Sequence, residues 1–257
     1  MKASEKFNLY TLSRPSFDEE AFERFLLDND SNWIKKGSST HADRLLEGAG
    51  RLCYMAFGKG AQSERDNNQY IGNLIDKGHE SVLEHISWTF LITGVSRAFT
   101  HQLVRHRAGF SFSQLSQQYH DESNTNFIEP NELKNIPELH KEWEKLVQNS
   151  LSFYKKLAQL DLGSVGTLEV REKKRLIRSI ARSVLPNATS SKIVVTANAR
   201  AIRHFLLMRG NIGGDPEMRM VSRAILKEVK LDAPATFQDF ELSDDYDSIG
   251  SVVKVSK

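Results

Sequence analysis

The chain has 257 residues, of which 39% are hydrophobic and 26% are charged, and its formal net charge is +2 at pH 7. This length can bury one sizeable core and no Pro/Gly/Ser-rich linker interrupts it, so we expect a single domain over residues 1–241. The polar stretch over 242–257 is expected to be a mobile tail with weak strand character. No apolar run approaches the roughly 20 residues of a membrane span and no apolar signal segment opens the chain, which favours a cytoplasmic protein without membrane contact.

Apolar residues recur with a helical period in seven segments, and β-branched or aromatic residues concentrate in three short ones. In chain order, the sequence predicts a strand over 8–12, helices over 17–29, 41–57 and 63–77, a strand over 86–95, helices over 137–160 and 171–185, a strand over 192–196, and helices over 199–209 and 216–229. Long helix pairs separate the strands, which favours an α+β architecture over a regular βαβ repeat.

The segment over 105–119, RHRAGFSFSQLSQQY, carries the strongest functional signal in the chain. Guanidinium groups match phosphate oxygens and also stack on flat rings, so this composition indicates a nucleotide site. For the basic triplet alone, solvated surface is the alternative interpretation.

The same region has a predicted local structure. Ser96 can cap a helix over RAFTHQLVRHR, on which Arg97, His101 and Arg105 would share one face. Gly109 would then end the helix and begin a Ser-rich loop, which can bring hydroxyls and backbone N–H groups against a ligand.

A second cation, Arg209, extends an apolar helical stripe instead of a polar face. It follows Ile202, Phe205 and Leu206 at the spacing i, i+3, i+4 and i+7. A guanidinium turned inward needs a partner, so we expect a carboxylate, a carbonyl or an anionic ligand opposite it. The alternative is an arginine whose charge reaches solvent at the helix end.

The remaining motifs argue against other sites. The single cysteine, Cys53, excludes an internal disulfide and a multi-cysteine metal site, and its place on an amphipathic segment predicts a buried side chain. No G-x-G-x-x-G or Walker loop is present. His79 and Glu80 begin like a zinc-protease motif, but Leu83 occupies the position of the second histidine, so no metal is predicted.

Four ordered segments resemble the flavin-dependent thymidylate synthases. These are the RHR triplet with Ser116 beyond it, GHESVLEH at 78–85, ARSVLP at 181–186 and ANARAIRHFLLMRG at 197–210. The resemblance covers roughly residues 45 to 240. It implies a mostly antiparallel central sheet flanked by long helices, of the thymidylate synthase-complementing type, and a homotetramer with shared active sites.

The resemblance also implies the reaction and its participants. It is the reductive methylation of dUMP to dTMP with FAD as redox cofactor, NADPH as reductant and 5,10-methylenetetrahydrofolate as carbon donor, without a cysteine nucleophile. Arg209 would be the catalytic residue. The implied dUMP-binding residues are Gln102, Arg105, Gln114, Ser116, Gln118, Arg182 and Arg209. The implied FAD-binding residues are His79, Ser81, Glu84, Arg105, His106, Arg107, Gln114, Asn198, Arg200 and His204.

Departures from the family pattern keep a second interpretation open. Gln118 stands where the family often has an arginine aimed at the dUMP phosphate, and Gln114 stands where an acidic residue is common. A charge-assisted contact typically contributes about 1.5–3 kcal/mol, so dUMP binding would weaken unless another cation such as Arg182 compensates. The alternative is a dUMP- or flavin-binding relative that lacks methyl transfer.

A nucleic-acid surface is a third, weaker interpretation. Basic rows at 97–105 and 175–182 have spacings that fit phosphate contacts. The net charge of +2 argues against it, and the aromatic residues do not alternate with the basic ones as a stacking platform would require. In the second row, we expect Arg175 and Arg178 to be mostly solvated.

Overall fold

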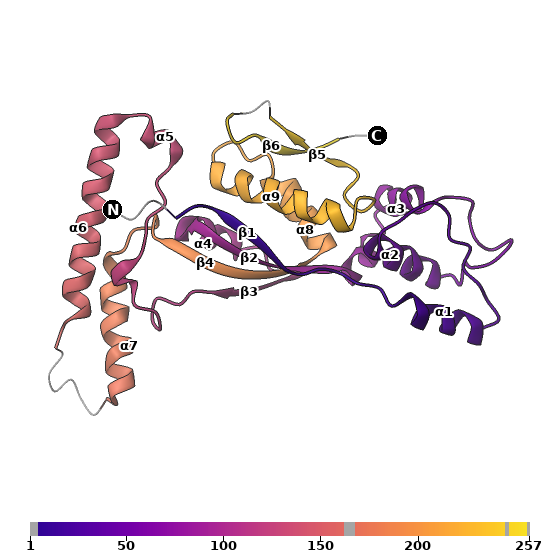
Figure 1. The fold of residues 1–257 in the computed structure, drawn as a ribbon, viewed down its shortest axis with the longest axis horizontal. Helices are drawn as coiled ribbons and strands as arrows, with labels where there is room; N and C mark the ends of the chain where they lie inside the picture. The colour runs from indigo at the N-terminus through magenta and orange to yellow at the C-terminus, as the bar shows by residue number, and fades with distance from the viewer. Residues whose placement is uncertain (1–4, 162–167, 245–246, 256–257) are drawn as a thin grey trace. The chain divides into compact units, whose positions relative to one another are not determined.

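The computed structural model describes residues 5–161, 168–244 and 247–255. Its main sheet has four antiparallel strands in the order β1-β2-β4-β3, and a second sheet pairs β5 with β6 (Figure 1). The strands are β1 (Asn8–Ser13), β2 (Ser87–Ser96), β3 (Phe110–Gln114), β4 (Ser190–Asn198), β5 (Phe240–Ser243) and β6 (Ser251–Lys254). This mixture of helices with an antiparallel sheet confirms the predicted α+β class.

The chain divides into two compact units. Unit 1 comprises residues 1–8, 91–105 and 112–194, and unit 2 comprises residues 9–90, 106–111 and 195–257. The prediction of a single domain over 1–241 stays a prediction.

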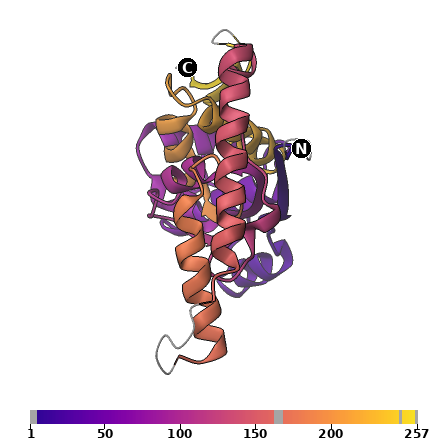
Figure 2. The same cartoon turned by 90° about the vertical axis from the view of Figure 1, so that its left-hand side faces the viewer.

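Unit 1 is largely helical within the described ranges. Its helices are α4 (Arg97–Leu103), η2 (Glu122–Asn124), α5 (Asn131–Lys134), α6 (Pro137–Ala158), α7 (Val170–Ala181) and η3 (Arg182–Val184). Helices α6 and α7 run side by side (Figures 1 and 2). The fully buried Tyr154 of α6 fixes the preceding loop, because its hydroxyl accepts a hydrogen bond from the backbone N–H of Glu122 at 3.0 Å.

Unit 2 surrounds a core to which most of its helices contribute. Its helices are α1 (Glu19–Asp28), α2 (His41–Leu52), α3 (Asn67–Asp76), η1 (Glu80–His85), α8 (Ala199–Arg209) and α9 (Pro216–Asp232). Leu46, Ile71 and Leu83 are fully buried in this core. Asp43 of α2 accepts hydrogen bonds from the backbone N–H groups of Ala235 and Thr236, which ties the segment after α9 to α2.

Three local expectations differ from the structure. The helix predicted through Arg107 ends at Leu103, so Arg105 lies beyond the helix and does not share a helical face with Arg97. The predicted Ser-rich loop contains β3, in which Phe110 and Phe112 alternate with serines as a half-buried strand requires. Helix α2 ends at Leu52, which leaves Cys53 exposed as its C-cap residue instead of buried.

Part of the segment expected to be a mobile tail is β-strand. β6 pairs antiparallel with β5 in a register that sets Phe240 opposite Lys254 and Ser243 opposite Ser251. Val252 is buried, so apolar burial accompanies the pairing. Among the described helices, none combines the length and the apolar character that crossing a membrane requires.

Candidate active-site residues in the two units

In unit 2, the imidazole of His106, the middle residue of the Arg-His-Arg triplet, is hydrogen-bonded to Arg209, the last residue of α8. Arg209 Nε donates a hydrogen bond to His106 Nε2 over 3.1 Å. The His106 ring also contacts Phe205 edge-to-face, with ring centroids 5.3 Å apart. Burial lowers the pKa of His106, and the charges of Arg209 and His204 lower it further. The unprotonated form is the one that can accept from Arg209, so the electrostatics and the hydrogen bond agree.

Within unit 2, Arg209 has a hydrogen-bond partner that the sequence did not predict. Arg209 is half-buried, as its place on the apolar stripe predicts, and its Nε donates to the imidazole of His106. The expected carboxylate, carbonyl or anionic ligand opposite the guanidinium stays a prediction. An imidazole leaves the positive charge of the guanidinium uncompensated.

The turn after the triplet is packed directly against the start of α8. Gly109 has φ +73°, and a Cβ at this position would lie 2.8 Å from the Cβ of Ala201. Its carbonyl accepts from the backbone N–H of Asn198 at 3.2 Å, while the Asn198 side-chain oxygen caps α8 by accepting from the N–H of Ala201 at 2.9 Å. Only glycine combines this φ with this close approach, which keeps the 106–111 segment next to α8.

The predicted FAD residues of η1 and α8 are linked by an ion pair. Arg200 donates to Glu84 Oε1 at 2.6 Å, and its Nε lies 3.5 Å from Glu80. The hydrogen bond to Glu84 raises the pKa of Arg200. Ser81 and the N-cap residue of η1, His79, are exposed next to this pair in the chain. Unit 2 thereby brings together, on η1, α8 and the 106–111 segment, the predicted residues His79, Ser81, Glu84, His106, Arg107, Asn198, Arg200 and His204.

In unit 1, the side-chain amide of Gln114 is hydrogen-bonded to two residues of the chain itself. Its Nε2 donates to the hydroxyls of Thr100 and Ser191 at 2.9 and 3.1 Å. Both amide hydrogens are thus engaged, and the carbonyl oxygen is the atom through which Gln114 could accept from a ligand. Sequence reasoning missed Thr100 and Ser191 as the residues that orient Gln114, because their contact depends on pairing between distant segments.

The signature serine opens a tight turn. Ser116 Oγ accepts from the backbone N–H of Gln118 at 3.3 Å, and its carbonyl accepts from the N–H groups of Tyr119 and His120. Gln118 Nε2 in turn donates to Ser179 Oγ at 3.0 Å. The residue that replaces the family's arginine therefore lies against α7.

Two arginines of α7 bind Tyr119, the residue that follows Gln118. Arg175 donates to the Tyr119 hydroxyl at 2.6 Å with its guanidinium 4.8 Å from the ring centroid, and Arg178 donates to the Tyr119 carbonyl at 2.7 Å. The expectation that these two arginines are mostly solvated is wrong, because Tyr119 occupies both. The sequence held one indication of this contact, because Tyr119 follows two glutamines and a guanidinium can stack on a tyrosine ring.

Two of the remaining predicted residues of unit 1 are cations that could bind a ligand. Arg105 and Arg182 are exposed, and neither makes an ion pair within the described ranges. Arg97 is half-buried, and this burial lowers its pKa. The charge of Glu122 raises the pKa of Arg97, whereas the charge of Arg182 lowers it further. Gln102 is half-buried on α4. The neighbouring charges of Arg97 and Arg182 favour an anionic ligand.

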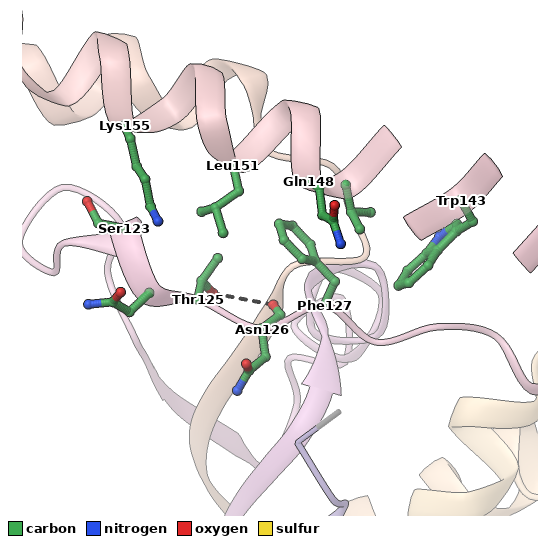
Figure 3. Close-up of a pocket in the computed structure, with 10 residues that line it drawn as sticks. Ser123, Thr125, Asn126, Phe127, Trp143, Gln148, Leu151 and Lys155 are labelled. Atoms are coloured by element: carbon green, nitrogen blue, oxygen red, sulfur yellow. Dashed lines mark hydrogen bonds between the residues drawn. The ribbon is translucent and has the colours of Figure 1, made fainter. Parts of the chain in front are cut away.

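A separate cavity of about 300 Å³ lies in unit 1 between α6 and the 123–127 segment (Figure 3). Trp143, Leu151 and Phe127 give it an apolar wall, and Lys155 extends toward it from α6. None of the predicted site residues lines this cavity. Elsewhere in the described part of the chain, no group of three or more His, Cys, Asp or Glu side chains is arranged to hold a metal ion.

The comparisons with known proteins agree with the four motifs. The family described as Thymidylate synthase complementing protein matches residues 37–235. A protein of Mycobacteroides abscessus named flavin-dependent thymidylate synthase is 41% identical over 225 residues, which cover 85% of this chain and 87% of that protein. A protein of Mycobacterium leprae with the same name is 38% identical over 224 residues, with the same two coverages. The chain therefore belongs to the thymidylate synthase complementing protein family, the family of enzymes that includes the flavin-dependent thymidylate synthases.

Proposed function

We propose that the chain is a flavin-dependent thymidylate synthase that converts dUMP to dTMP, with FAD as redox cofactor, NADPH as reductant and 5,10-methylenetetrahydrofolate as carbon donor. The observation that carries the proposal is the hydrogen bond between Arg209 and His106, because it joins the triplet motif to the last motif of the family pattern. A homotetramer and a cytoplasmic location are further parts of the proposal.

The residues of unit 2 suit FAD. Arg107 supplies exposed positive charge for a pyrophosphate, and His79 and Ser81 supply further polar groups. Arg200 is assigned to FAD as well, although its charge is paired with Glu84. Gly109 keeps the chain beside these residues free of a side chain. When bound, FAD would supply the hydride chemistry, while these residues bind it and fix its orientation.

The residues of unit 1 suit a nucleoside monophosphate. Arg105 and Arg182 are the cations assigned to the phosphate, and the carbonyl oxygen of Gln114 can accept from a ligand N–H or O–H. Ser116 is assigned to binding and not to nucleophilic attack, because its hydroxyl serves the turn by accepting from the Gln118 N–H. No cysteine nucleophile is assigned, since Cys53 lies at the end of α2.

Arg209 is the proposed catalytic residue. His106 fixes its Nε and, being neutral, does not cancel its charge. A positioned positive charge stabilises a pyrimidine that gains electron density at carbon 5. A preorganised donor of this kind is typically worth about 3–4 kcal/mol, and it needs no covalent help from the enzyme.

The decisive experiment measures release of tritium from dUMP labelled at carbon 5, with FAD, NADPH and 5,10-methylenetetrahydrofolate present. Wild type should release tritium only with all components, and Arg209→Ala should lose at least about 100-fold in rate. Arg24→Ala, an exposed arginine on α1, is the matched control and should retain full activity. Absence of release from a folded, FAD-bound wild type would overturn the synthase assignment.

The second candidate is a binding-only relative, and it rests on Gln118. Because Gln118 lies against Ser179 instead of supplying a cation, the phosphate would depend on Arg105 and Arg182. If wild type binds dUMP and FAD without releasing tritium, and Gln118→Arg restores release, the chain is a relative with a decayed phosphate site. If wild type is active and Gln118→Arg gains less than about twofold, Arg105 and Arg182 already supply the charge that the phosphate needs.

A further inference from the structure

The cavity between α6 and the 123–127 segment is long and narrow. The residues of α6 that line it recur at helical spacing and share one face of the helix, namely Trp143, Val147, Gln148, Leu151 and Lys155. From the first to the last of these residues, the helix rises about 18 Å. A volume of about 300 Å³ spread over this length suits an extended ligand better than a compact one.

One end of the cavity carries a positive charge. Lys155 is the only charged side chain among the described residues that line it, and it extends from α6 toward the 123–127 segment (Figure 3). Within the described ranges, Lys155 forms neither an ion pair nor a side-chain hydrogen bond. The carboxylate of Asp121, just before this segment, does not line the cavity and accepts from the hydroxyl and the N–H of Ser123 at 2.6 and 2.9 Å. The ammonium group of Lys155 is therefore available to an anion.

Beyond Lys155, the cavity is apolar. Leu151 and Phe127 come next, and Trp143 lies furthest from Lys155 among the residues labelled in Figure 3. Val147 is only 2% exposed. The hydroxyl of Thr125 donates to the backbone carbonyl of the following residue at 3.4 Å, so it is not free to donate to a ligand. An apolar wall of this kind favours a hydrocarbon chain.

The wall opposite α6 is held in place by the chain itself. Phe127 pairs with Thr189 in an isolated antiparallel bridge, and the Asn126 carbonyl accepts from the backbone N–H of Ser190 at 2.9 Å. These contacts fix the 123–127 segment without a ligand. A preformed wall lowers the cost of ordering on binding, which favours a real binding site over a packing gap.

We propose that this cavity binds a medium-chain alkyl carboxylate, with the carboxylate at Lys155 and the chain extended along α6 toward Trp143. A compact aromatic acid would fill one end only, whereas an extended chain contacts both. A cationic amphiphile would meet the like charge of Lys155. None of the residues assigned to dUMP or FAD lines the cavity, so the proposal does not rest on the proposed function.

Tryptophan fluorescence of the full chain titrated with decanoate is the first test. Trp143 is the tryptophan of the cavity, whereas Trp33 and Trp88 belong to unit 2. Wild type should show a saturable change in emission, and Trp143→Phe should show none. No saturable change in wild type up to about 1 mM decanoate, or an undiminished change in Trp143→Phe, would overturn the proposal.

Exchanging the charge tests the headgroup without disturbing the core, because Lys155 is exposed. Lys155→Gln should raise the Kd for decanoate by about tenfold or more, since a charge-assisted contact is lost. Lys155→Glu should bind decyltrimethylammonium more tightly than decanoate. The matched control is Lys156→Gln, an exposed lysine outside the cavity, whose Kd should stay within about twofold of wild type because salt screens its charge. Equal affinities of Lys155→Gln and Lys156→Gln would exclude Lys155 as the anion site.

Blocking the cavity tests the position of the chain. Leu151→Trp fills the space between Lys155 and Trp143 and should abolish the binding heat of decanoate in calorimetry. Leu146→Trp is the matched control, because Leu146 is 64% exposed on the same helix and does not line the cavity. If Leu151→Trp binds decanoate as tightly as Leu146→Trp, the chain does not occupy this cavity.

Discussion

The Nε of Arg209 donates to the Nε2 of His106 across 3.1 Å, and this bond joins residues that lie 103 positions apart in the chain. It fixes one edge of the guanidinium while leaving its charge uncompensated. The arrangement requires His106 to be unprotonated, and burial with two neighbouring cationic or titratable side chains favours that state. The acceptor role of His106 can therefore be tested through its titration.

The pKa of His106 is expected below its ordinary value of 6.5. Arg209→Gln should raise it only in part, because burial is the larger cause and remains. NMR titration of the His106 ring in both proteins measures this. A wild-type ring that titrates at or above 6.5 would contradict the acceptor role.

The same shift predicts how stability depends on pH. As the pH falls below about 6.5, the unfolded chain takes up a proton at position 106 that the folded chain resists. The free energy of unfolding should therefore decrease as the pH falls from about 6.5 through the lower folded pKa. His106→Gln should flatten this part of the curve in urea unfolding experiments.

Gly109→Ala should destabilise unit 2 through both strain and steric contact. An alanine in this left-handed conformation costs about 1–2 kcal/mol, and the close contacts with Ala201 and Asn198 add about 1–3 kcal/mol. Gly78→Ala isolates the first contribution, because Gly78 has φ +70° and an added Cβ would meet nothing within 4 Å. Equal losses of unfolding free energy in the two variants would exclude the packing role of Gly109.

Tyr119 should position the signature turn more than it stabilises the fold. Tyr119→Phe removes the hydroxyl that accepts from Arg175, whereas Tyr119→Ala also removes the ring beneath the guanidinium. A partly exposed contact of this kind is worth about 0.5–1 kcal/mol, so the unfolding free energy should change little. The KM for dUMP should rise in the order wild type, Tyr119→Phe, Tyr119→Ala. A larger effect on kcat than on KM would instead place Tyr119 in the chemical step.

Sequence periodicity predicted most helices and strands, because α6, α8 and β2 each present a regular apolar face. It failed where distant segments decide the structure. β3 alternates Phe110 and Phe112 with serines, but Gly109 and the serines also fit a loop, and only pairing with β4 resolves the choice.

The arginines of α8 show the same limit within one helix. The apolar spacing identified Arg209 as inward, yet the more deeply buried cation is Arg203, at 5% exposure. Arg203 is covered by the segment that carries Thr236 and Asp239, more than 30 residues further along the chain. Helical period gives the direction of a side chain, but not what the rest of the chain places against it.

Asp239→Asn should strongly destabilise unit 2, because it would leave that buried guanidinium with a neutral partner. Arg203 donates to both carboxylate oxygens of Asp239, at 2.6 and 2.8 Å, and also to the Thr236 carbonyl. Removing one partner of a buried pair typically costs about 3–5 kcal/mol. Asp244→Asn is the matched control, since that carboxylate also bonds to an arginine, Arg223, but is 85% exposed and should contribute less than about 1 kcal/mol.

The acid dependence of unfolding gives a second, independent measure of the Arg203–Asp239 pair. Burial by itself would raise the pKa of Asp239, but the hydrogen bonds and charge of Arg203 outweigh it and hold the pKa below the ordinary 3.8. The stability from this pair is thus fully present above about pH 3.8 and is lost as the pH falls through the lower folded pKa. Urea unfolding between pH 2 and 5 should show that Asp239→Asn removes this part of the acid sensitivity while Asp244→Asn keeps it. Identical acid profiles for the two variants would mean that the carboxylate of Asp239 is not what compensates Arg203.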